Sequence, residues 1–454
     1  MIFYSPQFIL FFIAFVVGLR FFPQGPLRMW YVVAASYVFY AGWYPPYLVV
    51  LIGLSALGYW GGLLVERHPR LSAPVIVALF LPLVVFKYSG FLTENAERLF
   101  GVEIAFSPRW QLPLGISFIT FTVISYVIDI RRGVLKARTK FHQVALFAAY
   151  FPHLVAGPIL RGRELLPQLD RIRFTGGMVA FGSLLFAVGA AKKVVLADGL
   201  GPWIDALYAS DIPLTAGQSL LAIYGFTAQI YLDFSGYTDM AIGLAAIIGV
   251  RLPRNFERPY LSASVRDFWR RWHMTLSRWL RDYIYIPFGG NRHGFTRMMM
   301  AIMATMLLGG LWHGAAWTFV IWGGAHGAAM VFEHVSGRIV SEPVLPIAVR
   351  RLIVLNFVAA TWVLFRASDF DQVGMVFSGL GNTTDWAAFG SDAAWPLLLL
   401  AIAAATHRFD SLSRVRWLSR RLSAPVTITI AVVAVALATA LAVGNPGTFI
   451  YFDF

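Results

Sequence analysis

The sequence predicts an all-α, polytopic integral membrane protein. Hydrophobic residues make up 58% of the 454 residues and charged residues only 13%, whereas soluble globular proteins average about 45–50% and about 25%. So few charges cannot cover a water-soluble body of this size. Apolar runs near the roughly 20 residues that cross a bilayer core recur along the chain. We therefore expect about 11–13 transmembrane helices, together with re-entrant and interfacial helices.

The expected spans follow one another along the whole chain. The first five cover residues 8–19, 29–42, 46–65, 71–88 and 111–130. Seven more cover residues 176–196, 216–250, 298–312, 313–333, 352–366, 395–407 and 424–443. Several of these runs are short or interrupted, as in broken and re-entrant helices. Because no internal repeat or soluble domain separates them, we expect a single membrane domain over residues 1–454.

Basic residues gather in some of the connecting loops and are scarce in others. The formal net charge is +14, and its clusters lie at 131–140, 161–173, 251–281 and 408–421. An excess of Lys and Arg marks the cytoplasmic loops of a bacterial inner-membrane protein. These charges then face anionic lipid headgroups, and no nucleic-acid partner is expected. No Lys or Arg precedes the first span, so the N-terminus is expected on the periplasmic side. Counting the crossings from there puts the C-terminus on the periplasmic side as well.

A histidine inside an apolar region is the first candidate functional residue. His313 lies within the region 298–333, beside glycines at 309, 310 and 314. An ionisable group at membrane depth is costly and therefore suggests a function. The small neighbours would let another backbone or a substrate approach closely. A neutral imidazole can remove a proton from an attacking hydroxyl group. The alternative is a structural histidine that is hydrogen-bonded between helices.

A cationic, tryptophan-rich segment at about 265–283 is expected to form a basic interfacial helix. Its central run is Phe268-Trp-Arg-Arg-Trp-His-Met-Thr-Leu-Ser277. An anchor in the membrane interface accounts for most of these residues. His273 is harder to explain in that way, and we expect it to face the same chamber as His313.

Two acidic residues lie in the apolar span 216–250. Asp233 and Asp239 surround Gly236, and we expect this polar cluster to break the helix. The carboxylates could bind a cation or relay protons, or they could pair with arginines of the interfacial helix and hold it. We favour the structural role, in which both carboxylates support the site.

The segment at 149–161 contains two prolines, Pro152 and Pro158. Proline interrupts helical hydrogen bonding, so a re-entrant segment is expected here rather than a full span. His153 would line the mouth of the cavity, and a packing role is the alternative.

Five runs taken together resemble the membrane-bound O-acyltransferase family. They are Phe151-Pro-His-Leu-Val-Ala-Gly-Pro158, Asp233-Phe-Ser-Gly-Tyr-Thr-Asp239, Phe268 to Ser277, Leu311-Trp-His-Gly-Ala-Ala316 and Phe449-Ile-Tyr-Phe-Asp-Phe454. The likeness covers residues 5–454 in motif order. It is greatest to the bacterial branch that contains the alginate O-acetyltransferase membrane subunit, and weaker to the teichoic-acid D-alanyl transfer protein.

The resemblance implies a ring of tilted helices pierced by a central tunnel, which joins a cytoplasmic donor to an extracytoplasmic acceptor. It implies that His313, in the Trp-His-Gly motif, is the catalytic residue. It also implies that His273, in the Arg-Trp-His motif, is the second active-site histidine.

The aromatic C-terminal tail, residues 449–454, admits two interpretations. It could anchor the last helix in the membrane interface. Alternatively, Tyr451 could carry the acyl group transiently, as similar tails in this type of acylation system suggest, because a phenyl ester is more activated than an alkyl ester.

The expected reaction moves an acetyl group from acetyl-CoA, or from another acyl thioester such as an acyl carrier, to a hydroxyl group. His313 would deprotonate the hydroxyl, and His273, a tryptophan N–H or an arginine would stabilise the oxyanion. Arginines at the cytoplasmic mouth would attract the phosphates of the donor. The residues expected to line the tunnel or bind the donor are Trp272, Trp312, Arg266, Arg270, Arg271, Asp233, Asp239 and His153.

We expect no bound cofactor and no metal, because no histidine pair at ligand spacing has carboxylate support and the chain has no cysteine. The expected acceptor is an exported or cell-envelope polysaccharide of the alginate type, acetylated with a periplasmic SGNH-like acetyltransferase as partner. The rival functions are an ion- or proton-coupled transporter or flippase, D-alanyl-type transfer to another envelope polymer, and a scaffold for the periplasmic enzyme.

Overall fold

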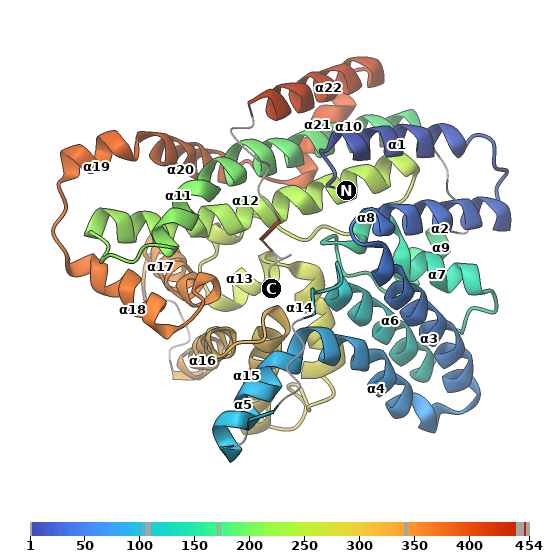
Figure 1. Ribbon diagram of the computed structural model, residues 1–454, viewed down its shortest axis with the longest axis horizontal. Coiled ribbons are helices and arrows are strands. Elements are labelled where there is room, and N and C mark those ends of the chain that lie inside the picture. The colour runs from blue at the N-terminus through green and yellow to red at the C-terminus, as the bar shows by residue number, and fades with distance from the viewer. Residues whose placement is uncertain are drawn as a thin grey trace. The chain divides into compact units, whose positions relative to one another are not determined.

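The computed structural model describes residues 2–101, 103–104, 110–169, 172, 174–339, 344–441 and 449–450. Over these residues the chain is helical and contains no β-strand (Figure 1). The prediction of an all-α protein is confirmed. The chain divides into two compact units. The expectation of one membrane domain stays a prediction.

The first unit comprises Met1–Phe186, Thr238–Pro253 and Ser419–Ala431. Its core is α6 (Ile116–Arg131), which is buried along almost its whole length and packs against three of its neighbours, α3, α4 and α7. The helices from the N-terminus onward are α1 (Pro6–Gly18), α2 (Pro26–Ala41), α3 (Leu48–Arg67), α4 (Ser72–Leu83), α5 (Ser89–Phe100), α7 (Phe141–Ala149), α8 (Phe151–Leu154) and α9 (Gly162–Leu169).

The second unit comprises Ala187–Tyr237, Arg254–Leu418 and Val432–Phe454. Its helices are the π-helical η4 (Ala191–Ala197), α11 (Asp198–Tyr208), α13 (Val265–Arg271), α14 (Met274–Leu280), the π-helical η6 (Arg281–Tyr285), α15 (Phe295–His313), α16 (Trp317–Ile339), α17 (Ile347–Arg366), α18 (Phe370–Ser378), α19 (Trp386–Asp392) and α20 (Ala394–His407). Four helices contain a boundary between the units: α10 (Gly176–Ala190), α12 (Ala216–Ile248), α21 (Leu412–Arg421) and α22 (Ala424–Ala440).

Each expected span coincides with helices over most of its described residues. Five helical stretches in the described part of the chain are long and apolar enough to cross a membrane, namely Pro45–Arg67, Pro69–Phe100, Gly176–Tyr208, Phe295–His313 and Ile347–Arg366. A sixth is added if α19 and α20, which meet at 76°, form one broken span. The other expected spans are helices that are shorter or more polar. The chain is a multi-pass membrane protein, and the total number of crossings stays a prediction.

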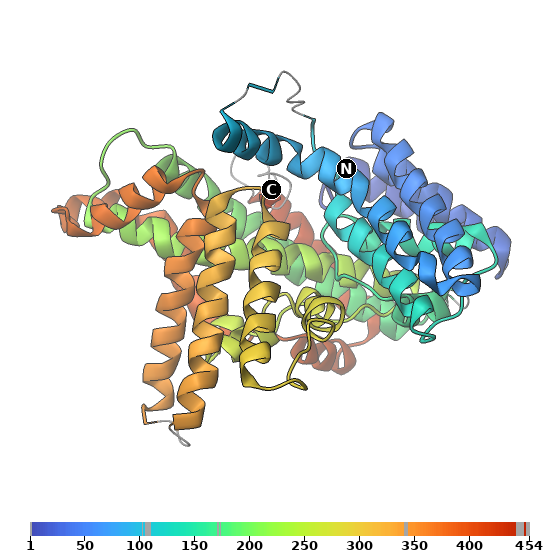
Figure 2. The same cartoon turned by 90° about the horizontal axis from the view of Figure 1, so that it is seen from below.

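Three long helices, α15, α16 and α17, run side by side in the second unit (Figure 2). A Cβ atom on Gly310 of α15 would lie 2.3 Å from the carbonyl oxygen of Phe319, and one on Gly323 of α16 would lie 2.3 Å from that of Met306. Only glycine fits at either position, and the two backbones therefore touch. This contact confirms the expected close approach of backbones near His313.

The prediction that the helix breaks at Gly236 was wrong. Helix α12 is continuous from Ala216 to Ile248. A Cβ atom at Gly236 would lie 2.8 Å from the carbonyl oxygen of Gly189 and 3.0 Å from the backbone nitrogen of Lys193. Glycine at this position lets a neighbouring helical segment pack closely against α12 without interrupting its hydrogen bonds.

The interfacial helix expected at 265–283 is divided in two. Helix α13 ends at Arg271 and α14 begins at Met274. Between them Trp272 is extended, and His273 adopts the left-handed conformation, with φ 40° and ψ 53°. A residue other than glycine is costly in this conformation and persists only where its surroundings hold it.

Candidate active site

His313 ends helix α15 and is buried, with 2% of its surface exposed. Three aromatic rings surround its imidazole, at centroid distances of 4.9 Å for Trp312, 5.2 Å for Trp322 and 5.3 Å for Phe365. Aromatic walls exclude water, and in such a site electrostatic interactions are stronger than in solution.

His273 lies beside His313, as the sequence predicted. The centroids of the two imidazole rings are 6.4 Å apart, and His273 is fully buried. Phe234 of α12 contacts the ring of His273 at 4.8 Å, with the ring planes nearly perpendicular. His273 lies in the break between α13 and α14, and His313 lies at the end of α15. These two positions bring the histidines together.

Asn255, which the sequence did not single out, fixes the orientation of His273. Its Oδ1 atom accepts hydrogen bonds from the backbone nitrogen of Thr275 at 3.1 Å and from the Thr275 hydroxyl at 2.9 Å. A backbone N–H can only donate, so the Asn255 atom that faces it is the oxygen. Nδ1 of His273 lies 3.1 Å from the same oxygen and must donate a proton to it.

The neutral His273 ring therefore carries its proton on Nδ1 and a lone pair on Nε2. Burial lowers the pKa of His273, which lies outside the candidate spans, to about 3. The ring is thus neutral at physiological pH. Asn255 also accepts the backbone N–H of Met274 with its own carbonyl, at 2.9 Å, and this second contact supports the left-handed backbone at His273. The asparagine lies 18 residues before the histidine, at a spacing that gives no signal in the sequence.

His326 is a third buried histidine near the pair, and it too was missed. Its Nδ1 accepts the indole N–H of Trp269 at 3.3 Å, and its Nε2 lies 3.0 Å from the hydroxyl of Thr361. Its ring lies 5.0 Å from that of Trp322, which in turn contacts His313. Both ring nitrogens are engaged within the protein, so we assign His326 to the support of the aromatic wall.

Trp272 and Trp312 belong to this aromatic wall. The Trp272 ring stacks on Phe268 at 5.6 Å and lies 4.9 Å from Trp362. Trp312 contacts both catalytic candidates, at 4.9 Å from His313 and 6.2 Å from His273. Of the two tryptophans, Trp312 is therefore the one in contact with the histidine pair.

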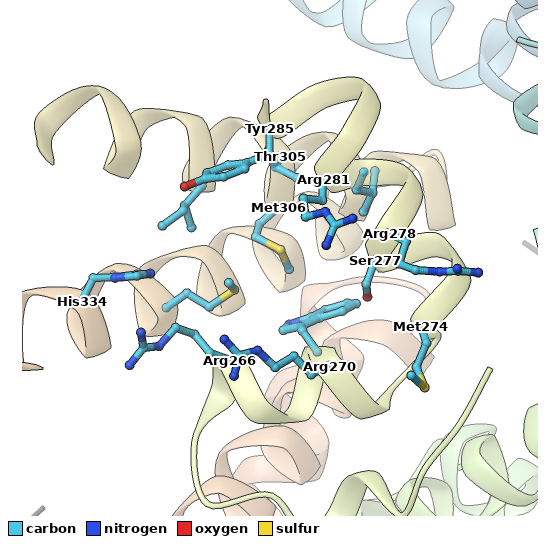
Figure 3. A pocket seen from close by; sticks show the side chains of 14 residues that line it. Arg266, Arg270, Met274, Ser277, Arg278, Arg281, Tyr285, Thr305, Met306 and His334 are labelled. Atoms are coloured by element: carbon cyan, nitrogen blue, oxygen red, sulfur yellow. The ribbon is translucent and has the colours of Figure 1, made fainter. Parts of the chain in front are cut away.

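A cavity of about 440 Å³ opens in the second unit among α13, α14, η6, α15 and α16. Figure 3 shows basic side chains around it, and its wall also carries apolar ones. The basic residues are Arg266, Arg270, Arg278, Arg281 and His334, and the large apolar residues are Trp269, Met274, Leu280, Ile302, Met306 and Met330. A cationic cavity with apolar walls suits a ligand that has an anionic part and an apolar part.

The predicted donor-binding arginines occupy different positions. Arg266 pairs with Glu333 at 3.2 Å, and Arg270 is exposed at the cavity with no acidic partner among the described residues. Arg271 pairs with Asp267 at 2.9 Å and does not line the cavity. Arg270 is therefore the predicted arginine with the most freedom to bind an anion.

The cavity runs close to the histidine pair. Met274 on its wall directly follows His273 in the chain. Met306 on its wall lies seven residues before His313 on α15, which puts it on the same face about two turns away. A ligand held by the arginines could therefore extend along α15 toward the histidines.

Asp233 does not pair with an arginine of the interfacial segment, contrary to one alternative considered for it. It is fully buried, and its Oδ1 lies 2.6 Å from the ammonium group of Lys193. Lys193 also pairs with Asp198 at 2.6 Å. Asp239 lies on the part of α12 that belongs to the first unit, where it is half-buried.

His153 belongs to the first unit, on the short helix α8. It is buried, and its Nε2 lies 3.3 Å from the carbonyl oxygen of Phe147. This hydrogen bond accounts for the packing role. The position of His153 at the mouth of a tunnel stays a prediction.

The described part of the C-terminal tail lies beside α12. Phe449 is buried, with its ring 4.8 Å from Tyr237 and 5.8 Å from Phe234. The backbone nitrogen of Ile450 donates a hydrogen bond to Oδ2 of Asp233 at 2.9 Å. Tyr451, the predicted acyl carrier, lies outside the described residues. Elsewhere in the described chain, no group of three or more His, Asp or Glu side chains could hold a metal ion.

The model of the membrane-bound O-acyltransferase family matches residues 114–368, a range that includes both histidines, Asn255 and the cavity. The chain is 40% identical to the probable alginate O-acetylase AlgI of Azotobacter vinelandii over 397 residues, which cover 85% of this chain and 79% of the relative. It is 33% identical to the peptidoglycan O-acetyltransferase of Helicobacter pylori over 80% of this chain and 75% of the relative. It is 30% identical to the teichoic acid D-alanyltransferase of Bacillus subtilis over 56% of this chain and 66% of the relative.

Proposed function

Because the chain belongs to the membrane-bound O-acyltransferase family and is an O-acyltransferase, we propose that it transfers acetyl groups to an exported or cell-envelope polysaccharide of the alginate type. The donor is a cytoplasmic thioester, and acetyl-CoA is our first choice. The names of the relatives support this acceptor class, since they include alginate and peptidoglycan O-acetylation. The observation that carries the proposal is the buried His273–His313 pair beside a cavity lined by arginines.

In the proposed mechanism His313 is the general base. Its imidazole takes the proton of the acceptor hydroxyl as the oxygen attacks the thioester carbonyl. A C–O bond forms, the C–S bond breaks, and the departing thiolate takes the proton from the imidazolium. The aromatic rings around His313 exclude water, which favours transfer over hydrolysis.

His273 is assigned a different role from the one that we first expected. Its Nδ1 proton is committed to Asn255, and a neutral ring in this tautomer has only a lone pair left on Nε2. It can therefore accept a hydrogen bond from the attacking hydroxyl or from His313, but it cannot donate one to an oxyanion. We assign the oxyanion to an indole N–H, with Trp312 as the candidate in contact with both histidines.

The arginine-lined cavity is proposed as the donor site. Phosphate groups of CoA would bind Arg270 and its basic neighbours, and the thioester arm would follow the apolar wall toward His313. The phosphopantetheine arm of an acyl carrier has the same phosphate and thioester chemistry, so it is the second candidate for the donor.

We place the protein in the bacterial inner membrane, with both termini periplasmic and the basic loops in the cytoplasm. In this orientation Tyr451 would accept the acetyl group from the donor thioester and pass it to a periplasmic SGNH-like acetyltransferase. That enzyme would complete the modification of the polymer. Of the rival functions, D-alanyl-type transfer would use the same site with another acyl group. A transporter would instead use the buried charged residues as an ion or proton pathway and would need no acyl donor.

Acetyl analysis of the exported polymers in a deletion strain tests the proposal. Loss of O-acetyl groups from one polysaccharide is expected, with recovery on expression of the parent chain and no recovery with His313→Ala at equal membrane abundance. Full acetylation in the deletion strain would contradict the acceptor class. Recovery by His313→Ala would contradict the assigned base.

A further inference from the structure

The buried Lys193–Asp233 ion pair has no role in the acyl-transfer step described above. Lys193 and Asp233 are 2% and 1% exposed at their side chains, and Asp198 is the second carboxylate on Lys193. Burying charges is expensive, and removing one partner of a buried pair leaves a costly unpaired charge. Two carboxylates share this one ammonium group, so the ammonium remains paired if Asp233 is lost.

The second oxygen of Asp233 is occupied by the far end of the chain. Oδ2 accepts the backbone N–H of Ile450 at 2.9 Å, across 217 residues of sequence. A hydrogen bond from a backbone N–H to a buried carboxylate is charge-assisted and roughly twice as strong as a neutral one. The Lys193–Asp233 pair therefore presents a fixed acceptor to a peptide segment.

Next to this acceptor is a slot for one aromatic side chain. Phe449 fills the slot, 4.8 Å from Tyr237 and 5.8 Å from Phe234. The same Phe234 ring lies 4.8 Å from His273. One phenyl ring therefore separates the docked tail from the histidine pair.

We propose that α12 and η4 form a docking site for the C-terminal tail, in which Asp233 is a positioning residue that holds Ile450 beside Phe234, the ring that contacts His273. The docking itself stands on the contacts of Phe449 and Ile450. Only the part of the tail in acyl transfer rests on the proposed function.

Cysteine labelling tests the docking without any acyl transfer. The chain has no cysteine, so Ile450→Cys gives one reactive thiol and keeps the backbone N–H. The rate of its reaction with a maleimide in purified protein is measured in the parent and in Asp233→Ala. We expect Asp233→Ala to raise the rate by about tenfold or more, because a hydrogen bond to a charged group contributes about one to two powers of ten to an equilibrium.

Asp198→Asn is the matched control. It removes a carboxylate from the same lysine but leaves the acceptor for Ile450 in place, so the labelling rate should stay within about twofold of the parent. Equal rates in the parent and Asp233→Ala would overturn the proposal. So would an equal rise in both variants, because the tail would then respond to the general loss of charge and not to its own acceptor.

A backbone variant keeps the proposal testable if Asp233→Ala fails to fold. Ile450→Pro removes the N–H donor and changes nothing in α12. Faster trimming of the tail by carboxypeptidase in Ile450→Pro than in Ile450→Ala is expected, and equal trimming would overturn the docking. If Asp233→Ala frees the tail while acetyl transfer continues at the parent rate, the part of the tail in acyl transfer is contradicted but the docking stands.

Discussion

At the scale of single residues, the site depends on contacts that no local pattern in the sequence reveals. His313 could be selected because an imidazole in an apolar run is unusual, and His273 because a membrane-interface anchor does not account for it. Asn255 and His326 could not, because their importance comes from hydrogen bonds to residues that are distant in sequence. The left-handed backbone at His273 has the same origin. Asn255 accepts hydrogen bonds from the backbone N–H groups of Met274 and Thr275, the two residues that follow His273.

Asn255→Asp should change the pH dependence of acetyl transfer. Burial lowers the pKa of His273 to about 3, and a carboxylate at position 255 would raise that pKa by favouring the imidazolium. The protonated ring lacks the lone pair on Nε2, so activity should fall at acidic pH. We expect the acid limb of the rate profile to move up by about 1–3 pH units. A uniformly lower profile of unchanged shape would show that Asn255 acts only on stability.

Arg270→Ala should weaken the binding of acetyl-CoA. Loss of one exposed charge contact of about 1 kcal/mol corresponds to a rise in KM of about fivefold, with kcat nearly unchanged. Arg271→Ala is the control, because Arg271 pairs with Asp267 and does not line the cavity. Steady-state kinetics at two ionic strengths measure both. A larger effect in Arg271→Ala would place the donor elsewhere.

At the scale of helices, hydropathy predicted where helices form but not how they end or touch. Lipid requires every backbone hydrogen bond to be satisfied within the segment, so long apolar runs become helices. The continuity of α12 and the break between α13 and α14 were predicted incorrectly because both depend on packing partners. Gly236 faces the backbone of a neighbouring helix, and His273 is held by a loop asparagine.

Gly310→Ala should displace His313 and lower activity strongly, whereas Gly309→Ala should not. The Cβ atom at Gly310 would meet a carbonyl oxygen at 2.3 Å, which separates α15 from α16. At Gly309 the nearest atom is the end of the Leu280 side chain, at 3.2 Å. A displacement of about 1 Å at a catalytic group costs about 100-fold in rate. The ratio of kcat between the two variants is the measurement, and equal values would contradict the tight contact.

At the scale of the whole molecule, the distribution of charge predicts the orientation in the membrane. The basic loop around Lys136 should be cytoplasmic and the acidic loop around Asp211 periplasmic; both residues are exposed. With no native cysteine, Asp211→Cys should react with a membrane-impermeant maleimide in intact cells. Lys136→Cys should react only after the membrane is permeabilised. The reverse pattern would place the donor and acceptor on the wrong sides for the proposed direction of transfer.

The central claim is that the His273–His313 pair is the centre of acyl transfer, and turnover of acetyl-CoA by purified protein tests it most directly. Protein in detergent is incubated with acetyl-labelled acetyl-CoA and a soluble hydroxyl acceptor, and labelled ester is counted for the parent and His313→Ala. Loss of a general base predicts a fall of about 100- to 10,000-fold, with donor binding and thermal stability close to those of the parent. Ester formation by His313→Ala at the parent rate would contradict the claim.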